Sequence, residues 1–307
     1  MNIERRHYLG GSDAAAVMGL SRWKSPIALW AEKTGRVEPG NISDKLPVKL
    51  GIRLEQIVCE LFTEETGLNV RRVNDVITHK EHSFLCANID RRIVGENAIL
   101  EAKTCSAYKA SEWNDDVPVE YLLQCYHYLA VARAKTCYLA VLIGNHEFKI
   151  KKINRDEHKN QISHLIDAEV KFWNNHILAD AMPEVVTSRD SDVLFALFPN
   201  ANQPALKFGD ESIHVKRAIE QRISDKKLID DATTRMKESE NVIKYHMQDH
   251  ETAQLDDYRI TWKNQTRKSI DVKRLAEEQP DIAEKYQTIT KMRVLRITEK
   301  KKENDND

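Results

Sequence analysis

The chain has 307 residues, with 47 Lys and Arg against 48 Asp and Glu, so its formal net charge is −1. No apolar stretch approaches the ~20 residues of a membrane-spanning helix, and the first residues lack the apolar core of a signal peptide. We therefore expect a cytoplasmic protein without a membrane partner. The balanced charge gives no indication of nucleic-acid binding, which must be argued from the local placement of charge.

The first part of the chain predicts helices, then strands, then helices again. Helices are expected over 12–18, 25–33 (ended by Gly35) and 50–65 (closed by Gly67), strands over 70–77, 85–94 and 98–104, and a further helix from Glu120. This order favours an α/β domain with a central mixed sheet flanked by helices. The five cysteines are odd in number and none forms a C-x-x-C pair, so neither a disulfide framework nor a zinc ribbon is supported.

A loop-rich passage from Pro183 to Pro204 marks a domain boundary. We expect one domain over 1–200, an accessory domain over 205–300 and a disordered tail over 301–307. Residues 210–250 have apolar positions at three- and four-residue spacing without Gly or Pro, which predicts one long amphipathic helix or a helical hairpin. A strand over 258–262, a helix over 272–287 interrupted near Pro280, and a strand over 292–297 are expected after it.

The densest chemical signal lies between Cys86 and Cys105. A Gly-Glu-Asn turn joins two β-branched runs, which predicts antiparallel strands in which Glu101 and Lys103 share a face. If Asp90 lies on the same face of the neighbouring strand, two carboxylates and an ammonium converge. Such a trio suits Mg²⁺ or Mn²⁺ with open positions for water and a phosphate oxygen.

The alternative is that these three side chains form a solvated hairpin face. The apolar run before Glu101 argues against it, because unpaired charges in a buried strand are costly. Two further polar residues, Glu55 and Gln124, lie in otherwise apolar helical segments and could serve the same site. For Gln124, a hydrogen-bonded core amide is an equally good interpretation.

Together these elements resemble the lambda-type exonuclease or YqaJ-like viral recombinase family of the PD-(D/E)xK nuclease superfamily. The matching pieces, in chain order, are Arg5 with Gly10–Ala15, Trp23–Pro26 with Leu29 and Trp30, Gly51 with Leu54–Glu55, Ile89–Asp90, Glu101–Lys103, and Gln124 with Tyr128–Leu129. The resemblance covers roughly residues 1–180. The residue before Asp90 is isoleucine rather than proline, which is the least chemical member of the motif.

The resemblance implies a restriction-endonuclease-like core and an exodeoxyribonuclease that digests one strand of linear duplex DNA from the 5′ end. The 3′ overhang would serve phage-type recombination in a bacterial host cell. Asp90, Glu101 and the carbonyl of Ala102 would hold Mg²⁺, for which Mn²⁺ substitutes. Glu55 would lie near the metal directly or through water, Lys103 would position the attacking water, and Gln124 would hold the lysine or the scissile phosphate.

The family reads the 5′-phosphate with an N-terminal arginine and serine. Arg5 and Ser12 match best and Arg6 competes with Arg5, while Asn88 could lie beside the pocket. Ser12-Asp13 before an alanine-rich helix looks like an N-cap, and helix N-termini attract anions. Trp23 and Lys24 fit either a stacking platform for DNA ends or, in our slight preference, the fixing of the next helix start.

Two points concern the rest of the molecule. Arg259, Lys263, Arg267 and Lys268 lie in a basic stretch that could follow a DNA backbone, although a solvated face is an equal alternative. The resemblance also implies a single-strand annealing protein as partner and a homo-oligomer, in ring form among processive members.

Two other classes of protein are alternatives to this interpretation. A structure-specific or single-strand nuclease of the same fold often carries an iron–sulfur cluster that needs late cysteines, and none follows Cys137. A non-catalytic DNA-binding recombination mediator is disfavoured by the complete set of charged site residues.

Overall fold

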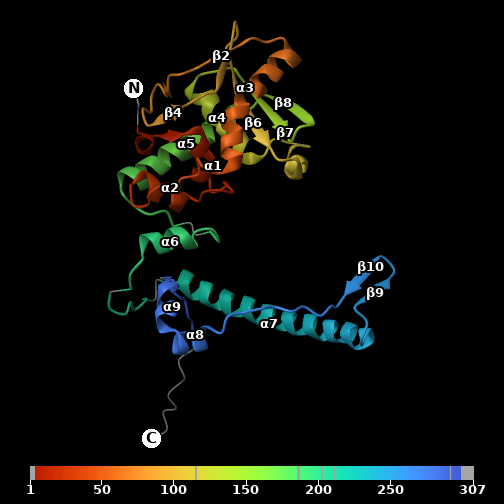
Figure 1. The fold of residues 1–307 in the computed structure, drawn as a ribbon. Coiled ribbons are helices and arrows are strands. Elements are labelled where there is room, and N and C mark those ends of the chain that lie inside the picture. Colours follow the sequence, from red (N-terminus) through yellow and green to blue (C-terminus); the bar gives the residue numbers. More distant parts are fainter. Residues whose placement is uncertain are drawn as a thin grey trace. The chain divides into compact units, whose positions relative to one another are not determined.

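The computed structural model describes residues 4–114, 116–184, 187–201, 203–209, 212–290 and 292–298. The chain divides into two compact units, Met1–Pro199 and Asn200–Asp307 (Figure 1). The expected disordered tail, 301–307, lies outside the described residues.

A five-stranded mixed sheet forms the centre of the first unit. Its order is β2 (Val70–Arg72), β5 (Arg91–Ile93), β6 (Ala98–Cys105), β7 (Thr136–Ile143) and β8 (Glu147–Asn154). Strands β6 and β7 are parallel, and the other neighbours are antiparallel. A parallel pair needs a crossover, which here contains α4 (Val119–Val131).

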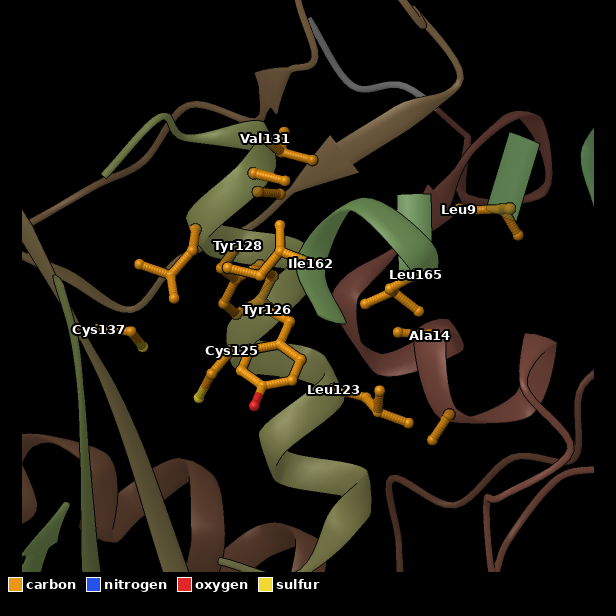
Figure 2. Close-up of a cluster of buried hydrophobic side chains, with 14 of the residues drawn as sticks. Leu9, Ala14, Leu123, Cys125, Tyr126, Tyr128, Val131, Cys137, Ile162 and Leu165 are labelled. Atoms are coloured by element: carbon orange, nitrogen blue, oxygen red, sulfur yellow. The ribbon is translucent and has the colours of Figure 1, made fainter. Parts of the chain in front are cut away.

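Helices cover both faces of this sheet. Val58, Cys59 and Phe62 of α3 (Leu46–Thr66) pack against Leu100 and neighbouring residues on one face. On the other face, α4 packs with α1 (Gly11–Val17) and α5 (Lys159–Phe172) over Ile99. Figure 2 shows part of this second core. Alternate residues of β6 thus face opposite layers, which directs Glu101 and Lys103 to the α4 side with Ile99.

A second, three-stranded sheet carries the N-terminal segment. Its order is β1 (Leu9–Gly10), β4 (Leu85–Ala87) and β3 (Ile77–Thr78). The expected continuous strands 70–77 and 85–94 are therefore wrong, because each is divided between the two sheets. Asp90 lies in the bend between β4 and β5 rather than within a strand.

The remaining elements of the first unit are short or helical. They are η1 (Arg5–His7), α2 (Pro26–Lys33), η2 (Ala107–Trp113), the π-helix η3 (Trp173–Leu178) and α6 (Ser191–Leu197). The expected helix starts at Ser12 and Leu50 need correction. Helix α1 begins at Gly11 with Gly10 as N-cap, and α3 begins at Leu46, about one turn early.

The second unit contains one unbroken helix, α7 (Ile213–Met247), so the hairpin alternative is wrong. A hairpin of β9 (Thr252–Leu255) and β10 (Tyr258–Thr261) follows it, and then α8 (Val272–Glu278) and α9 (Pro280–Lys285). The expected strand over 292–297 is wrong, because residues 292–298 pair with no strand among the described residues. None of the helices in the described ranges has the length and hydropathy for crossing a membrane.

Candidate active site

Asp90 and Glu101 meet where β6 passes the bend before β5. The Ala102 N–H donates to Asp90 Oδ2 at 2.9 Å. Because the N–H and C=O of one strand residue point to the same side, the Ala102 carbonyl also faces Asp90. Asp90 and the Ala102 carbonyl are therefore neighbours beside Glu101.

Glu101 is 3% exposed and is held through one carboxylate oxygen. Lys103 Nζ and Gln124 Nε2 both donate to Oε1, at 2.5 and 2.7 Å. The other oxygen, Oε2, is buried without a hydrogen-bond partner among the described residues. A buried carboxylate oxygen without a partner is energetically costly, so this atom is a natural ligand for a cation.

Gln124 connects this carboxylate to the aromatic layer of α4. Its Nε2 also lies 3.0 Å from Tyr128 Oη, while the Lys103 ammonium lies 5.5 Å from the centre of the Tyr121 ring. Gln124 is therefore both a hydrogen-bonded core amide and a direct neighbour of the candidate site, so the two interpretations of its sequence context are compatible.

Glu55 is brought close to Asp90 but points to another partner. It belongs to α3, on the opposite face of the sheet, and its Oε1 accepts from Arg91 Nη1 at 2.7 Å. The same nitrogen donates to the Asp90 carbonyl at 2.8 Å. Through Arg91, Glu55 orients the bend that carries Asp90.

The ionisation of the site reflects burial and mutual repulsion. Burial raises the pKa of Glu101 to about 8, with Lys103 opposing this shift and Asp90 adding to it. Burial likewise raises the pKa of Asp90. For Lys103, burial opposes the charged form, but Glu101 and Asp90 outweigh it and raise its pKa. A divalent cation between the two carboxylates would relieve their repulsion.

The donor set fits a hard divalent cation. No group of three or more His, Cys, Asp or Glu side chains among the described residues forms a metal cage. Mg²⁺ usually takes one or two carboxylates and keeps waters or substrate phosphates as its other ligands, so a complete protein cage is not required. Asp90, Glu101 with its free Oε2, and the Ala102 carbonyl meet this requirement.

A hollow of about 740 Å³ lies at the N-terminal segment. Its cationic lining residues are Arg5, Arg6, Lys24, Lys33 and Lys45. Arg5 Nη2 donates to Ser12 Oγ at 2.8 Å, so the predicted arginine and serine meet. Arg6 instead forms an ion pair with Glu38. Of the two arginines, it is therefore Arg5 that contacts Ser12.

A buried ion pair that the sequence did not reveal supports this hollow. Lys33 Nζ lies 2.8 Å from Asp13 Oδ2, and it donates to the carbonyls of Arg5 and Tyr8. Asp13 also accepts from the Gly10 N–H at 3.1 Å. In the sequence, Lys33 is distinguished only by its position at the end of an apolar helical segment.

Trp23 and Lys24 lie at the same hollow, in different environments. Ser25 Oγ caps α2 by accepting from the Ala28 N–H, and Pro26 follows. Trp23 is 61% exposed, so its ring is accessible at the hollow. Its ring lies 5.8 Å from that of Tyr121, which lies between the hollow and Lys103. Lys24 forms an ion pair with Glu32.

The other predicted residues have exposed side chains. Asn88 is exposed in the bend before Asp90. Arg259, Lys263, Arg267 and Lys268 are exposed residues of the second unit.

Comparison with known proteins identifies the family. Residues 3–135 match the model of the YqaJ-like viral recombinase domain. The chain is 37% identical over 302 residues to an uncharacterized protein, YqaJ, of Bacillus subtilis (strain 168), covering 97% of this chain and 93% of the relative. The chain belongs to the YqaJ-like viral recombinase family.

Solved structures with similar folds include two exonucleases. An alkaline exonuclease from Laribacter hongkongensis has a TM-score of 0.42 and 18% identity, covering 57% of this chain and 95% of that one. A phage-related exonuclease from Haemophilus somnus 129PT has a TM-score of 0.39 and 12% identity, covering 57% and 96%.

Proposed function

We propose that this YqaJ-like protein is a divalent-metal-dependent exodeoxyribonuclease that resects linear duplex DNA from the 5′ end. The observation that carries this proposal is the buried Glu101 with its free Oε2, beside Asp90 and Lys103. Family membership and the exonucleases among proteins of similar fold agree with it.

Asp90, Glu101 and the Ala102 carbonyl would hold Mg²⁺, with Mn²⁺ as a substitute. When bound, such an ion lowers the pKa of water and neutralises charge on the scissile phosphate. The Lys103 ammonium, fixed by Glu101, supplies a positive charge next to the attacked phosphate. Gln124 keeps Glu101 Oε1 occupied, so that Oε2 is the oxygen directed at the ion.

The Arg5–Ser12 pair would bind the 5′-phosphate of the strand being digested. The guanidinium and the hydroxyl both donate to a phosphate, and Lys33 holds the Arg5 backbone in place. The exposed Trp23 ring offers a stacking surface for a base between this pocket and Lys103. Asn88 and Lys24 would make peripheral contacts.

The proposal is tested with a linear duplex labelled at either end, in Mg²⁺, in Mn²⁺ or with chelator. Glu101→Gln and Lys103→Met should lower the rate at least ~100-fold, because each loses charge at the reacting phosphate. Glu96→Gln and Lys152→Met, which change the same residue types elsewhere, should cut as wild type. Label release only from the 5′-labelled strand end would support the polarity.

Three outcomes would overturn the proposal. Equal cutting rates for wild type and all variants would show that the activity does not depend on Glu101 and Lys103. Faster cutting of single strands or branched duplexes would favour a structure-specific nuclease. Binding of duplex without metal-dependent cutting would favour a non-catalytic mediator.

The finer parts of the proposal concern assembly and place. We propose that a single-strand annealing protein binds the 3′ overhang and is the partner of this protein. We also propose that the protein forms a homo-oligomer, with a ring among its forms, and that it acts in the cytoplasm of a bacterial host. Sedimentation with and without duplex, and co-purification with a single-strand annealing protein, test these points separately.

A further inference from the structure

Two arginines of the central sheet face each other directly. Arg71 of β2 and Arg92 of β5 are register partners. Like charges in opposite positions of neighbouring antiparallel strands are destabilising. Within the described ranges, neither side chain has an ion pair or a hydrogen bond to an acceptor. The pair therefore carries repulsion that the described part of the chain does not offset.

The register places this pair on the catalytic face of the sheet. Arg92 is opposite Ile99 of β6, and opposite residues point to the same face. Ile99, Glu101 and Lys103 alternate along β6 and share that face. Arg71 and Arg92 hence point to the side that carries the metal-site carboxylate.

The neighbouring arginines behave differently. Arg91 points to α3, where Glu55 and Gln56 accept from its guanidinium. Arg72 is the register partner of Arg91 and shares that opposite face. Among the residues that the structure describes, Arg91 thus has acceptors, whereas no acid pairs with Arg71 or Arg92 on the catalytic face.

The spacing suits a duplex that reaches the metal site. With strands ~4.8 Å apart and ~3.3 Å per residue, the Cα of Arg92 lies about 8 Å and that of Arg71 about 12 Å from the Cα of Glu101. At ~3.4 Å per base pair, these separations correspond to a few base pairs of DNA.

We propose that Arg71 and Arg92 form a phosphate clamp that binds one backbone phosphate of the duplex, a few base pairs from the scissile bond. Guanidinium groups bind phosphate through paired hydrogen bonds, and one anion between them removes their repulsion. The clamp rests on the proposed function, because it requires duplex DNA at Glu101. It is distinct from the Arg5–Ser12 pocket for the terminal phosphate.

The test compares Arg71→Ala, Arg92→Ala and the double variant with Arg72→Ala, which removes an arginine from the same strand but from the other face. All are made in the Glu101→Gln background, so that a short blunt 5′-phosphorylated duplex stays intact. Affinity is measured from about 50 to 200 mM salt, since each phosphate contact contributes a log–log slope of ~0.9.

We expect the double variant to lower the slope by about one and the affinity about five- to tenfold at ~0.1 M salt. Each single variant should show much of this loss, because both arginines serve one phosphate. Arg72→Ala should keep the parent slope. If Arg72→Ala loses as much duplex affinity as Arg71→Ala, or if none of the variants changes the salt slope, the proposed clamp is wrong.

A second measurement separates binding from folding. Arg71→Glu places a carboxylate opposite Arg92, so Tm should rise by roughly 1–3 °C while duplex affinity falls. A variant that is more stable yet binds less cannot owe its loss to misfolding. If Arg71→Glu binds duplex as tightly as its parent, the clamp is wrong. If the chain without these substitutions neither binds nor cuts duplex, the proposed function itself fails.

Discussion

At the scale of single residues, Gly11 determines how closely α1 approaches the candidate site. A Cβ there would lie 2.5 Å from Cε1 of Tyr128, whose hydroxyl contacts Gln124. We expect Gly11→Ala to destabilise the fold by about 1–3 kcal/mol through overpacking, and to lower cutting by displacing Gln124 from Glu101. Denaturant unfolding and the end-labelled duplex assay measure the two effects.

Gly51→Ala is the matched control. This glycine lies within α3, and an added Cβ would meet only Thr104 Oγ1, at an ordinary 3.7 Å. Alanine should stabilise the helix by up to about 1 kcal/mol. If both substitutions had the same effect on stability, close packing at Tyr128 would not explain Gly11.

Lys33 is the residue whose importance was hardest to see in the sequence. Its side chain and that of Asp13 are 4% and 3% exposed, so Lys33→Met leaves a buried carboxylate without its partner. We expect a loss of about 3–5 kcal/mol in unfolding free energy. Because Lys33 also holds the Arg5 and Tyr8 carbonyls, the preference for 5′-phosphate over 5′-hydroxyl ends should shrink.

The control for Lys33→Met is Lys24→Met in the same hollow. Lys24 pairs with Glu32, but these side chains are 29% and 20% exposed. Solvent screening limits the expected loss to about 1 kcal/mol. Equal destabilisation of the two variants would argue against a special role for the buried pair.

At the scale of elements, a buried imidazole joins α4, α5 and β4. His127 Nδ1 lies 2.9 Å from Glu169, and Nε2 lies 3.0 Å from the Cys86 carbonyl, with both side chains fully buried. A carboxylate and a carbonyl are both acceptors, so the imidazole is protonated on both nitrogens. Burial opposes this charge, but Glu169 and the carbonyl outweigh it and raise the pKa of His127.

The direction of the pH effect follows from this raised pKa. The contribution of His127 to stability is complete below its unfolded pKa of ~6.5 and is lost as pH rises through the folded value. The Tm of wild type should therefore be higher than that of Glu169→Gln, and the difference in Tm should be larger at about pH 6 than at about pH 9. As a control, Asp167→Asn changes a residue on the exposed face of α5 and should have the Tm of wild type at both pH values. Parallel curves for wild type and Glu169→Gln would contradict the charged pair.

The elements also show what sequence patterns can predict. Local signals were sufficient for α2, which Ser25 and Pro26 start, and for the end of α3 at Gly67, whose φ of 72° suits glycine. The alternation in β6 predicted the shared face of Glu101 and Lys103. The division of 85–94 between two sheets was not predictable, because it depends on the distant partners β1 and β2. The Lys33–Asp13 and Arg91–Glu55 pairs likewise join residues that are 20 and 36 positions apart.

At the scale of the whole molecule, the net charge of −1 conceals separate acidic and basic regions. Acidic side chains gather at the candidate metal site and cations line the N-terminal hollow. The second unit adds an exposed basic stretch with Arg259, Lys263, Arg267 and Lys268. Whether local placement or total charge governs DNA affinity is open to a direct test.

Replacing these four residues by alanine changes the net charge from −1 to −5. If they follow a DNA backbone, the salt slope of duplex binding should fall by up to ~3.6, at ~0.9 per contact, while cutting at saturating duplex is unchanged. The control replaces four exposed cations of α7, Lys216, Arg217, Lys226 and Lys227, and gives the same net charge. A long-range electrostatic effect would weaken both variants equally, whereas a backbone track weakens only the first. Equal losses would therefore assign the affinity to total charge and remove the basic stretch from the DNA-binding surface.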